Sequence, residues 1–112
     1  MEHDCLFCKI ANGDSPSEFL FENEDIIVIR DLYPQAPVHL LLIPKKHIRS
    51  INDITEPESH IVSGMIMTAR EMAKKEKVAE SGYKLIFNVE KGGGQVIFHL
   101  HMHLMGGWKE SL

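Results

Sequence analysis

The chain has 112 residues, the length of one ordinary domain, and we expect a single domain over residues 1–112. Its 44% hydrophobic and 25% charged residues are typical of a folded protein and argue against disorder. The formal net charge of −4 argues against a general binder of nucleic acids or anionic membranes, which is usually basic. No run approaches the ~20 apolar residues of a membrane span, and the acidic start MEHDCLFCKI does not resemble a secretory signal. We therefore expect a cytoplasmic protein with reduced cysteines.

The first half of the chain predicts strands. Residues 19–31 have apolar runs on both sides of the turn-like segment ENED, a pattern typical of a hairpin. The segment PQAP at 34–37 ends this pattern, and the apolar run VHLLLIP at 38–44 then predicts a buried strand. His39 lies within this strand, and the pattern does not show whether it serves the core or an active site.

The second half predicts one long helix followed by two strands. A helix from 58 to about 78 is indicated by Thr55 as a cap, Pro57 near its start and apolar residues at helical spacing, namely Ile61, Met65, Ala69, Met72 and Ala73. Gly82 is the predicted end of this helix. Strands are predicted at 83–90 and 96–105, with the loop KGGGQ between them. The order of elements favours an α+β domain with a mostly antiparallel sheet.

Three histidines alternate with apolar residues in HLHMHLM at 99–105. On a strand His99, His101 and His103 would share one face. A single metal held by all three is awkward, because the outer two would lie about 13 Å apart along the strand. Imidazole is also a nucleophile and a proton carrier near neutral pH. The three glycines just upstream allow backbone N–H groups to approach an anion, so the segment suggests a phosphate held beside imidazoles.

The cysteines form a C-x-x-C pair, Cys5 and Cys8, whose spacing suits two ligands of a tetrahedral zinc. Two further ligands would have to come from distant parts of the chain. His47, directly after a predicted strand, and His99 are candidates. The competing interpretation is a pair of buried thiols that happen to lie three residues apart.

These motifs together resemble the histidine triad (HIT) family. HLHMHLM fits the pattern His-φ-His-φ-His-φ-φ, where φ is apolar. The segments CLFCKI, RDLYPQAPVHLLLIPKKHI and NVEKGGGQVIFHLHMHLMGG look like the HINT-type nucleoside phosphoramidases, in the same order and spacing. The resemblance implies an antiparallel sheet of about five strands with one long helix and a short one. It also implies a homodimer with a continuous ten-stranded sheet.

The resemblance further implies hydrolysis of purine nucleoside 5′-phosphoramidates through a nucleotidyl-histidine intermediate. His101 would be the nucleophile, with His103 and His39 near the phosphate and the imidazole. Asp31 would hold the ribose and Leu32 would flank the purine. The implied phosphate-side residues are Asn88, Gly94, Gln95 and Val96. In some relatives a structural Zn²⁺ is held at the positions of Cys5, Cys8, His47 and His99.

Val96 departs from this resemblance, because many HINT-type proteins have a serine at its position. Valine supplies no hydroxyl for the phosphate or the leaving group. A second hypothesis is therefore a purine-nucleotide-binding or partner-binding regulator with weak catalysis. A third, a metallohydrolase that uses the triad, predicts that chelation abolishes activity.

Overall fold

The computed structural model describes residues 5–109 and confirms an α+β fold. Its sheet has five antiparallel strands in the order β1-β2-β3-β5-β4. The helices are α1 (Leu6–Ala11) and α2 (Ser59–Lys75), and the strands are β1 (Phe21–Glu22), β2 (Ile26–Arg30), β3 (Val38–Pro44), β4 (Tyr83–Ile86) and β5 (Met102–Gly106). Three 3₁₀ turns complete the described part: η2 (Ile51–Asp53), η3 (Glu56–Glu58) and η4 (Lys91–Gly93). None of the helices within 5–109 is long and apolar enough to cross a membrane.

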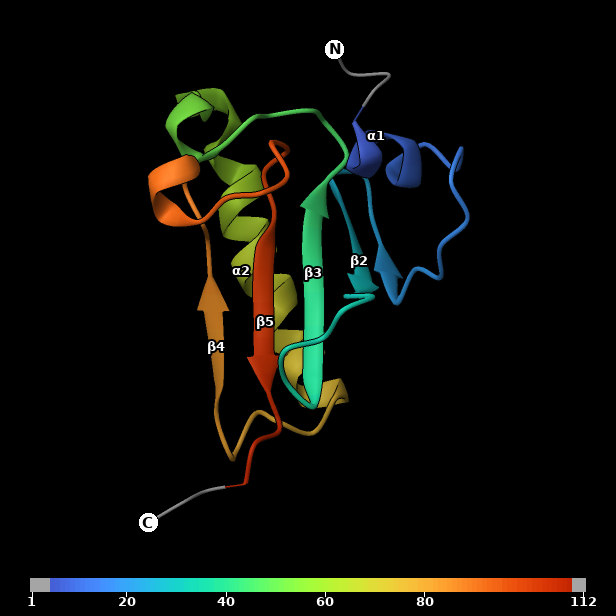
Figure 1. The fold of residues 1–112 in the computed structure, drawn as a ribbon, viewed down its shortest axis with the longest axis vertical. Coiled ribbons are helices and arrows are strands. Elements are labelled where there is room, and N and C mark those ends of the chain that lie inside the picture. The colour runs from blue at the N-terminus through green and yellow to red at the C-terminus, as the bar shows by residue number, and fades with distance from the viewer. Residues whose placement is uncertain (1–4, 110–112) are drawn as a thin grey trace.

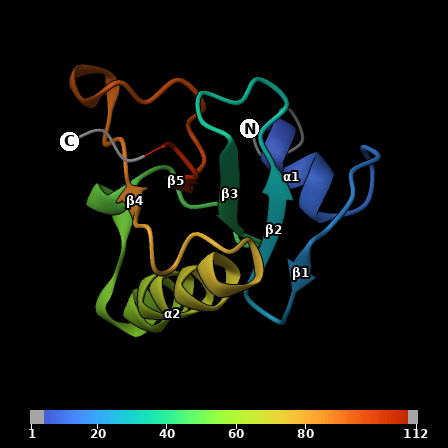
Figure 2. The same ribbon diagram turned by 90° about the horizontal axis from the view of Figure 1, so that it is seen from below.

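The sheet separates two layers. Helix α2 lies across one face, and α1 with the segments that follow β2 and β4 lies on the other (Figures 1 and 2). Strand β3 is central, and its side chains alternate between the layers because successive residues of a strand point to opposite faces. Leu40 and Leu42 join the core under α2, whereas Leu41 and Ile43 pack with Phe7 of α1. His39 therefore lies on the α1 side of the sheet.

Helix α2 confirms the predicted apolar face. The five apolar residues predicted at helical spacing are all buried against the sheet. Thr55 and Glu58 form a capping box at η3, directly before the helix.

The predicted helix end at Gly82 is wrong. Helix α2 stops at Lys75, and Lys77 takes a positive φ of 63°. The backbone N–H groups of Lys77 and Val78 donate to the carbonyls of Lys74 and Ala73, which is the Schellman arrangement. Val78 reaches the core from there, so burial of a valine ends the helix before the glycine.

The last two predicted strands are shorter than expected. The predicted strand at 83–90 ends at Ile86, and that at 96–105 pairs only from Met102 onward. Pairing with β3 stops at Leu42 and Met102. Beyond that point the Leu100 N–H donates to the Ile48 carbonyl, 2.6 Å away, and the Pro44 carbonyl accepts from the His99 ring. Of the three alternating histidines, His103 alone therefore lies in a strand, while His99 and His101 lie in the irregular segment that leads into β5.

Candidate functional site

A cleft of about 510 Å³ opens on the α1 side of the sheet. Of the residues assigned to nucleotide binding or catalysis from the sequence, the structure brings six into its wall: Asp31, Asn88, Gly94, Val96, His101 and His103. Leu32, Gln95 and His39 do not line it. Leu32 is 85% exposed, Gln95 is buried in the loop behind the wall, and His39 lies behind His103.

His101 presents one free ring nitrogen. Its Nδ1–H donates to the His99 carbonyl oxygen at 2.8 Å, which places the lone pair of the neutral ring on Nε2. Nε2 has no hydrogen-bond partner within residues 5–109. The edge of the Phe7 ring packs against the imidazole, with 5.1 Å between ring centroids. Burial lowers the pKa of His101, so the ring is neutral and nucleophilic at pH 7.

A chain of hydrogen bonds fixes the proton of His103. The Gln35 backbone N–H donates to His39 Nδ1 at 3.0 Å, so the proton of the neutral His39 is on Nε2. That Nε2–H faces His103 Nδ1 at 2.9 Å and the Asp31 carboxylate at 3.4 Å. Because His103 Nδ1 accepts, its own proton lies on Nε2. His101 therefore offers a lone pair to the cleft, whereas His103 carries an N–H donor.

Asp31, His39 and His103 also bring one potential metal-ligating atom each within 4.8 Å of one another. The hydrogen bond from Gln35 argues against a metal here, because it leaves His39 Nε2 protonated and without a lone pair. Asp31 is held by the Tyr33 backbone N–H, which donates to Oδ1 at 2.8 Å. This trio is better suited to orienting protons than to ligating an ion.

The four predicted zinc ligands lie together. One ligand atom from each of Cys5, Cys8, His47 and His99 falls within 4.8 Å of the other three. His99 Nδ1 lies 3.2 Å from Cys5 Sγ and 3.5 Å from Cys8 Sγ, and His47 Nδ1 lies 3.3 Å from Cys8 Sγ. In a tetrahedral zinc site a sulfur and a nitrogen ligand are about 3.6 Å apart, given Zn–S and Zn–N bonds of about 2.3 and 2.0–2.1 Å. The group could therefore hold a metal with little movement.

The orientation of His99 also suits metal binding. Its Nε2–H donates to the Pro44 carbonyl at 2.7 Å, which leaves the Nδ1 lone pair facing the two thiols. A backbone acceptor on the second ring nitrogen is the usual partner of a metal-bound histidine. Burial and the neighbouring His47 and His101 lower the pKa of His99 to about 4, which keeps Nδ1 unprotonated.

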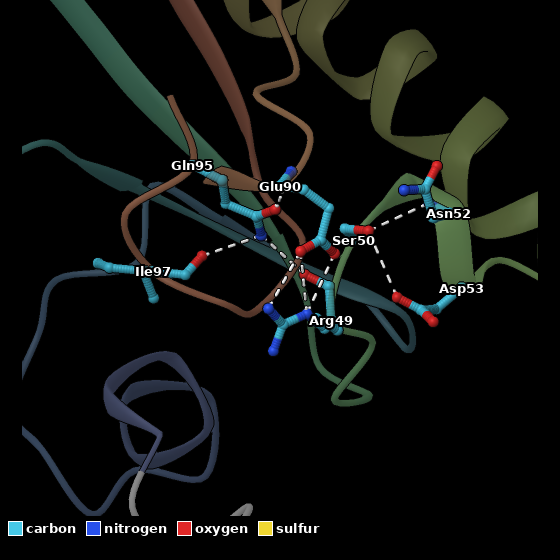
Figure 3. A network of polar contacts seen from close by, with 7 residues as sticks. All are labelled: Arg49, Ser50, Asn52, Asp53, Glu90, Gln95 and Ile97. Atoms are coloured by element: carbon cyan, nitrogen blue, oxygen red, sulfur yellow. Dashed lines mark hydrogen bonds and ion pairs between the residues drawn. The ribbon is translucent and has the colours of Figure 1, made fainter. Parts of the chain in front are cut away.

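The loop between β4 and β5 forms the remaining wall of the cleft. Gly94 has a φ of +86°, and the Asn88 side chain donates to the Gly93 carbonyl at 2.9 Å. The side chain of Gln95 points away from the cleft and makes hydrogen bonds to three backbone groups (Figure 3). It accepts from the Glu90 N–H at 2.7 Å and donates to the carbonyls of Arg49 and Ile97. The backbone around Gln95, rather than its amide, thus shapes the wall.

Sequence reasoning missed Phe7, which lines the cleft and packs against both His99 and His101. The sequence position of Phe7 could have indicated this role. It lies between the predicted metal ligands Cys5 and Cys8, so a metal that holds both cysteines would also hold Phe7 close to His99. Tyr33, Gln35 and Ile97 were also missed as lining residues, and no pattern in the sequence marks them.

Comparison with known proteins gives consistent results. The family model described as "Scavenger mRNA decapping enzyme C-term binding" matches residues 4–111. A purine nucleoside phosphoramidase of Escherichia coli K12 is 38% identical over 107 residues, which are 96% of this chain and 90% of that protein. The chain therefore belongs to the histidine triad (HIT) family.

Two solved structures are informative. A HIT family hydrolase from Legionella pneumophila is 48% identical with a TM-score of 0.91, covering 96% of both chains. A zinc-bound histidine triad protein from Mycobacterium smegmatis is 28% identical with a TM-score of 0.83, covering 95% of this chain and 76% of that one. They confirm the predicted five-stranded antiparallel sheet with one long helix.

The burial of His103 predicts an unusual titration. Burial, with smaller contributions from His101 and His39, lowers its pKa to about 4, against an ordinary value of about 6.5. Between these values the unfolded chain binds the proton and the folded chain does not. The contribution of His103 to stability is therefore complete above about pH 6.5 and declines as the pH falls toward 4. NMR titration of the His103 ring, assigned with His103→Gln, measures this pKa. A midpoint near 6.5 would contradict the burial argument.

Proposed function

We propose that this protein hydrolyses purine nucleoside 5′-phosphoramidates. The observation that carries the proposal is the pairing of an unpartnered Nε2 lone pair on His101 with an N–H donor on His103 in one cleft. The similarity to the E. coli phosphoramidase supports this substrate class. The cleft volume is within the usual ~300–1,000 Å³ range of small-molecule sites.

In the proposed reaction His101 Nε2 attacks the α-phosphorus, and the phosphorus–nitrogen bond breaks. The amine leaves after its nitrogen takes a proton from solvent in the cleft, while the neutral His103 donates its Nε2–H in a hydrogen bond to the phosphate. Water then attacks the nucleotidyl-histidine, transfers a proton to the cleft and releases the nucleoside monophosphate, which restores neutral His101. The His99 carbonyl stabilises the positive charge that His101 gains on attack, because it accepts the Nδ1–H bond throughout.

The other walls would bind the nucleotide. We propose that Asp31 accepts from the ribose hydroxyls, and that Asn88 with the backbone near Gly94 and Gln95 contacts the phosphate. The purine would pack near Phe7 and Ile97, with Leu32 at the exposed rim. His39 would act through His103, because it lies behind that ring.

One observation favours a second function, that of a nucleotide-binding regulator with weak catalysis. Val96 is 84% exposed in the cleft wall and has no hydrogen-bonding group to offer a leaving amine. A fluorogenic adenosine phosphoramidate distinguishes the two functions. Negligible hydrolysis with intact AMP binding would favour the regulator.

Replacement of the nucleophile tests the main proposal. His101→Asn should lower the turnover of an adenosine phosphoramidate by about a thousandfold or more, because no other lone pair replaces Nε2. AMP binding should persist, since asparagine keeps most of the cleft. Steady-state kinetics and calorimetry measure the two effects, with His60→Asn on the exposed side of α2 as the control. Full activity in His101→Asn would refute the nucleophile assignment.

We also propose that the Cys₂His₂ group holds a structural Zn²⁺. All four positions are filled by protein ligands, which is typical of structural rather than catalytic zinc. When bound, the ion would tie α1 to the segment after β3 and to His99. In the cytoplasm, the location that we propose, the thiols would remain reduced and able to ligate.

Metal analysis tests this site. The wild-type protein should retain about one zinc per chain after dialysis, and Cys5→Ser should retain little, because three ligands bind Zn²⁺ more weakly than four. Elemental analysis measures the content, and His60→Asn is again the control. Unchanged zinc in Cys5→Ser would exclude Cys5 as a ligand. Loss of all hydrolysis on chelation, with the fold retained, would instead favour the metallohydrolase hypothesis.

We propose a homodimer in which β4 pairs with its copy. Strand β4 is at the edge of the sheet (Figure 1), and Leu85 on it is 37% exposed. A nearly apolar hollow of about 450 Å³ includes Ile51, Ile54, Val62 and Ile66 beside α2. An edge strand can pair with a second chain, and an exposed apolar surface of this kind marks an interaction site.

Sedimentation tests the dimer. The wild-type protein should sediment as a dimer, and Ile66→Glu should produce monomers because it places a charge in the apolar interface. Met67→Glu is the matched control, since Met67 is similarly exposed but borders a different hollow, beside Phe21. A monomeric wild-type protein, or equal effects of both variants, would refute the proposed interface.

A further inference from the structure

Glu90 has a backbone conformation that normally requires glycine. Its φ is 57° and its ψ is 179°. This region is essentially restricted to glycine, because a Cβ clashes with the backbone there. Glu90 is the residue directly before the turn η4 and precedes the glycines 92–94, whose last member lines the cleft. The strain is therefore located at the base of the wall that would contact a phosphate.

A guanidinium holds the Glu90 side chain in place (Figure 3). Arg49 makes three hydrogen bonds to the Glu90 carboxylate, at 3.0, 3.1 and 3.2 Å. The Arg49 guanidinium carbon lies 4.3 Å from the centroid of the Phe98 ring, so the planar group is also packed from one side. These hydrogen bonds hold the pKa of Glu90 below its ordinary value, and the carboxylate is charged at neutral pH.

The backbone of the loop is closed from the inside as well. Gln95 N–H donates to the Glu90 carbonyl at 3.0 Å, and the Gln95 amide joins the Glu90 N–H to the Arg49 carbonyl. Gln95 is only 4% exposed, so these bonds are protected from water. Arg49 thus holds the loop through its side chain and, by way of Gln95, through its backbone.

We propose that Arg49 and Glu90 are positioning residues that hold the loop 90–95 in the shape that receives the nucleotide phosphate. This inference rests on the proposed function. The pair lies outside the core, with side-chain exposures of 53% and 34%. Neither residue lines the cleft, so the pair would act through the backbone that it holds. Strained residues persist where the surrounding structure fixes them, and they are common near binding sites.

The inference predicts a specific effect of removing the guanidinium. Arg49→Met keeps an apolar contact with Phe98 but releases the Glu90 carboxylate, and the strained backbone can then relax. AMP binding should weaken about tenfold, equivalent to ~1.4 kcal/mol. Adenosine binding should change less than about twofold, because its contacts lie on the other walls. Calorimetry with AMP and adenosine measures the ratio. Arg70→Met, which removes a similarly exposed arginine paired with Glu71 on α2, should leave it unchanged.

Rescue by glycine separates positioning from simple stabilisation. In Arg49→Met, the second change Glu90→Gly should restore the AMP-to-adenosine ratio, because glycine adopts this conformation without a clamp. Glu90→Ala should not restore it. If Arg49→Met does not fold, the single variant Glu90→Gly can be compared with the double variant Arg49→Met/Glu90→Gly. These two proteins should have the same ratio of AMP to adenosine affinity.

Four results would overturn the inference. Unchanged AMP binding in Arg49→Met would do so while leaving the proposed function intact. Equal loss of AMP and adenosine binding, or failure of glycine to rescue, would show that the clamp supports the whole fold instead. Wild-type protein that binds neither ligand would overturn the proposed function and this inference together.

Discussion

The arrangement of the site depends on His99. Its ring is fixed by the Nε2–H bond to the Pro44 carbonyl, which turns Nδ1 toward Cys5 and Cys8. Its backbone carbonyl accepts the Nδ1–H of His101, which leaves the other nitrogen of that ring free. One residue therefore orients both the candidate metal group and the candidate nucleophile. Because its carbonyl sets the tautomer of His101, displacement of His99 would also change which ring nitrogen the candidate nucleophile presents.

The three histidines differ by hydrogen bonding rather than by position alone. His101 has a lone pair on Nε2, whereas His103 has a proton there because His39 donates to its other nitrogen. Burial lowers the pKa of both rings and keeps them neutral at pH 7, so that His101 offers a lone pair and His103 offers a hydrogen-bond donor. The Asp31 carboxylate near His39 partly opposes this lowering of the His103 pKa.

Local patterns predicted much of this arrangement. The spacing of Met65 and its neighbours predicted the buried face of α2. The alternation along HLHMHLM predicted a shared face for its histidines, and the residues between them, Leu100, Met102 and Leu104, lie in the core. Features that depend on contacts between distant segments could not be predicted. Burial of Val78 set the end of α2. The last strand is shorter than predicted because His99 and Leu100 donate hydrogen bonds to the Pro44 and Ile48 carbonyls instead of pairing with β3. Nothing local indicates that Glu90 takes a conformation typical of glycine, since the Arg49 that holds it is 41 residues away.

The tautomer of His101 is the most direct test of this account. Long-range ¹H–¹⁵N NMR of the ring nitrogens near pH 7 distinguishes a proton on Nδ1 from one on Nε2. The hydrogen bond to the His99 carbonyl predicts that His101 carries its proton on Nδ1, with Nε2 unprotonated. A His101 ring protonated on Nε2 would contradict the account, because the lone pair would then face the backbone and no nucleophile would face the cleft.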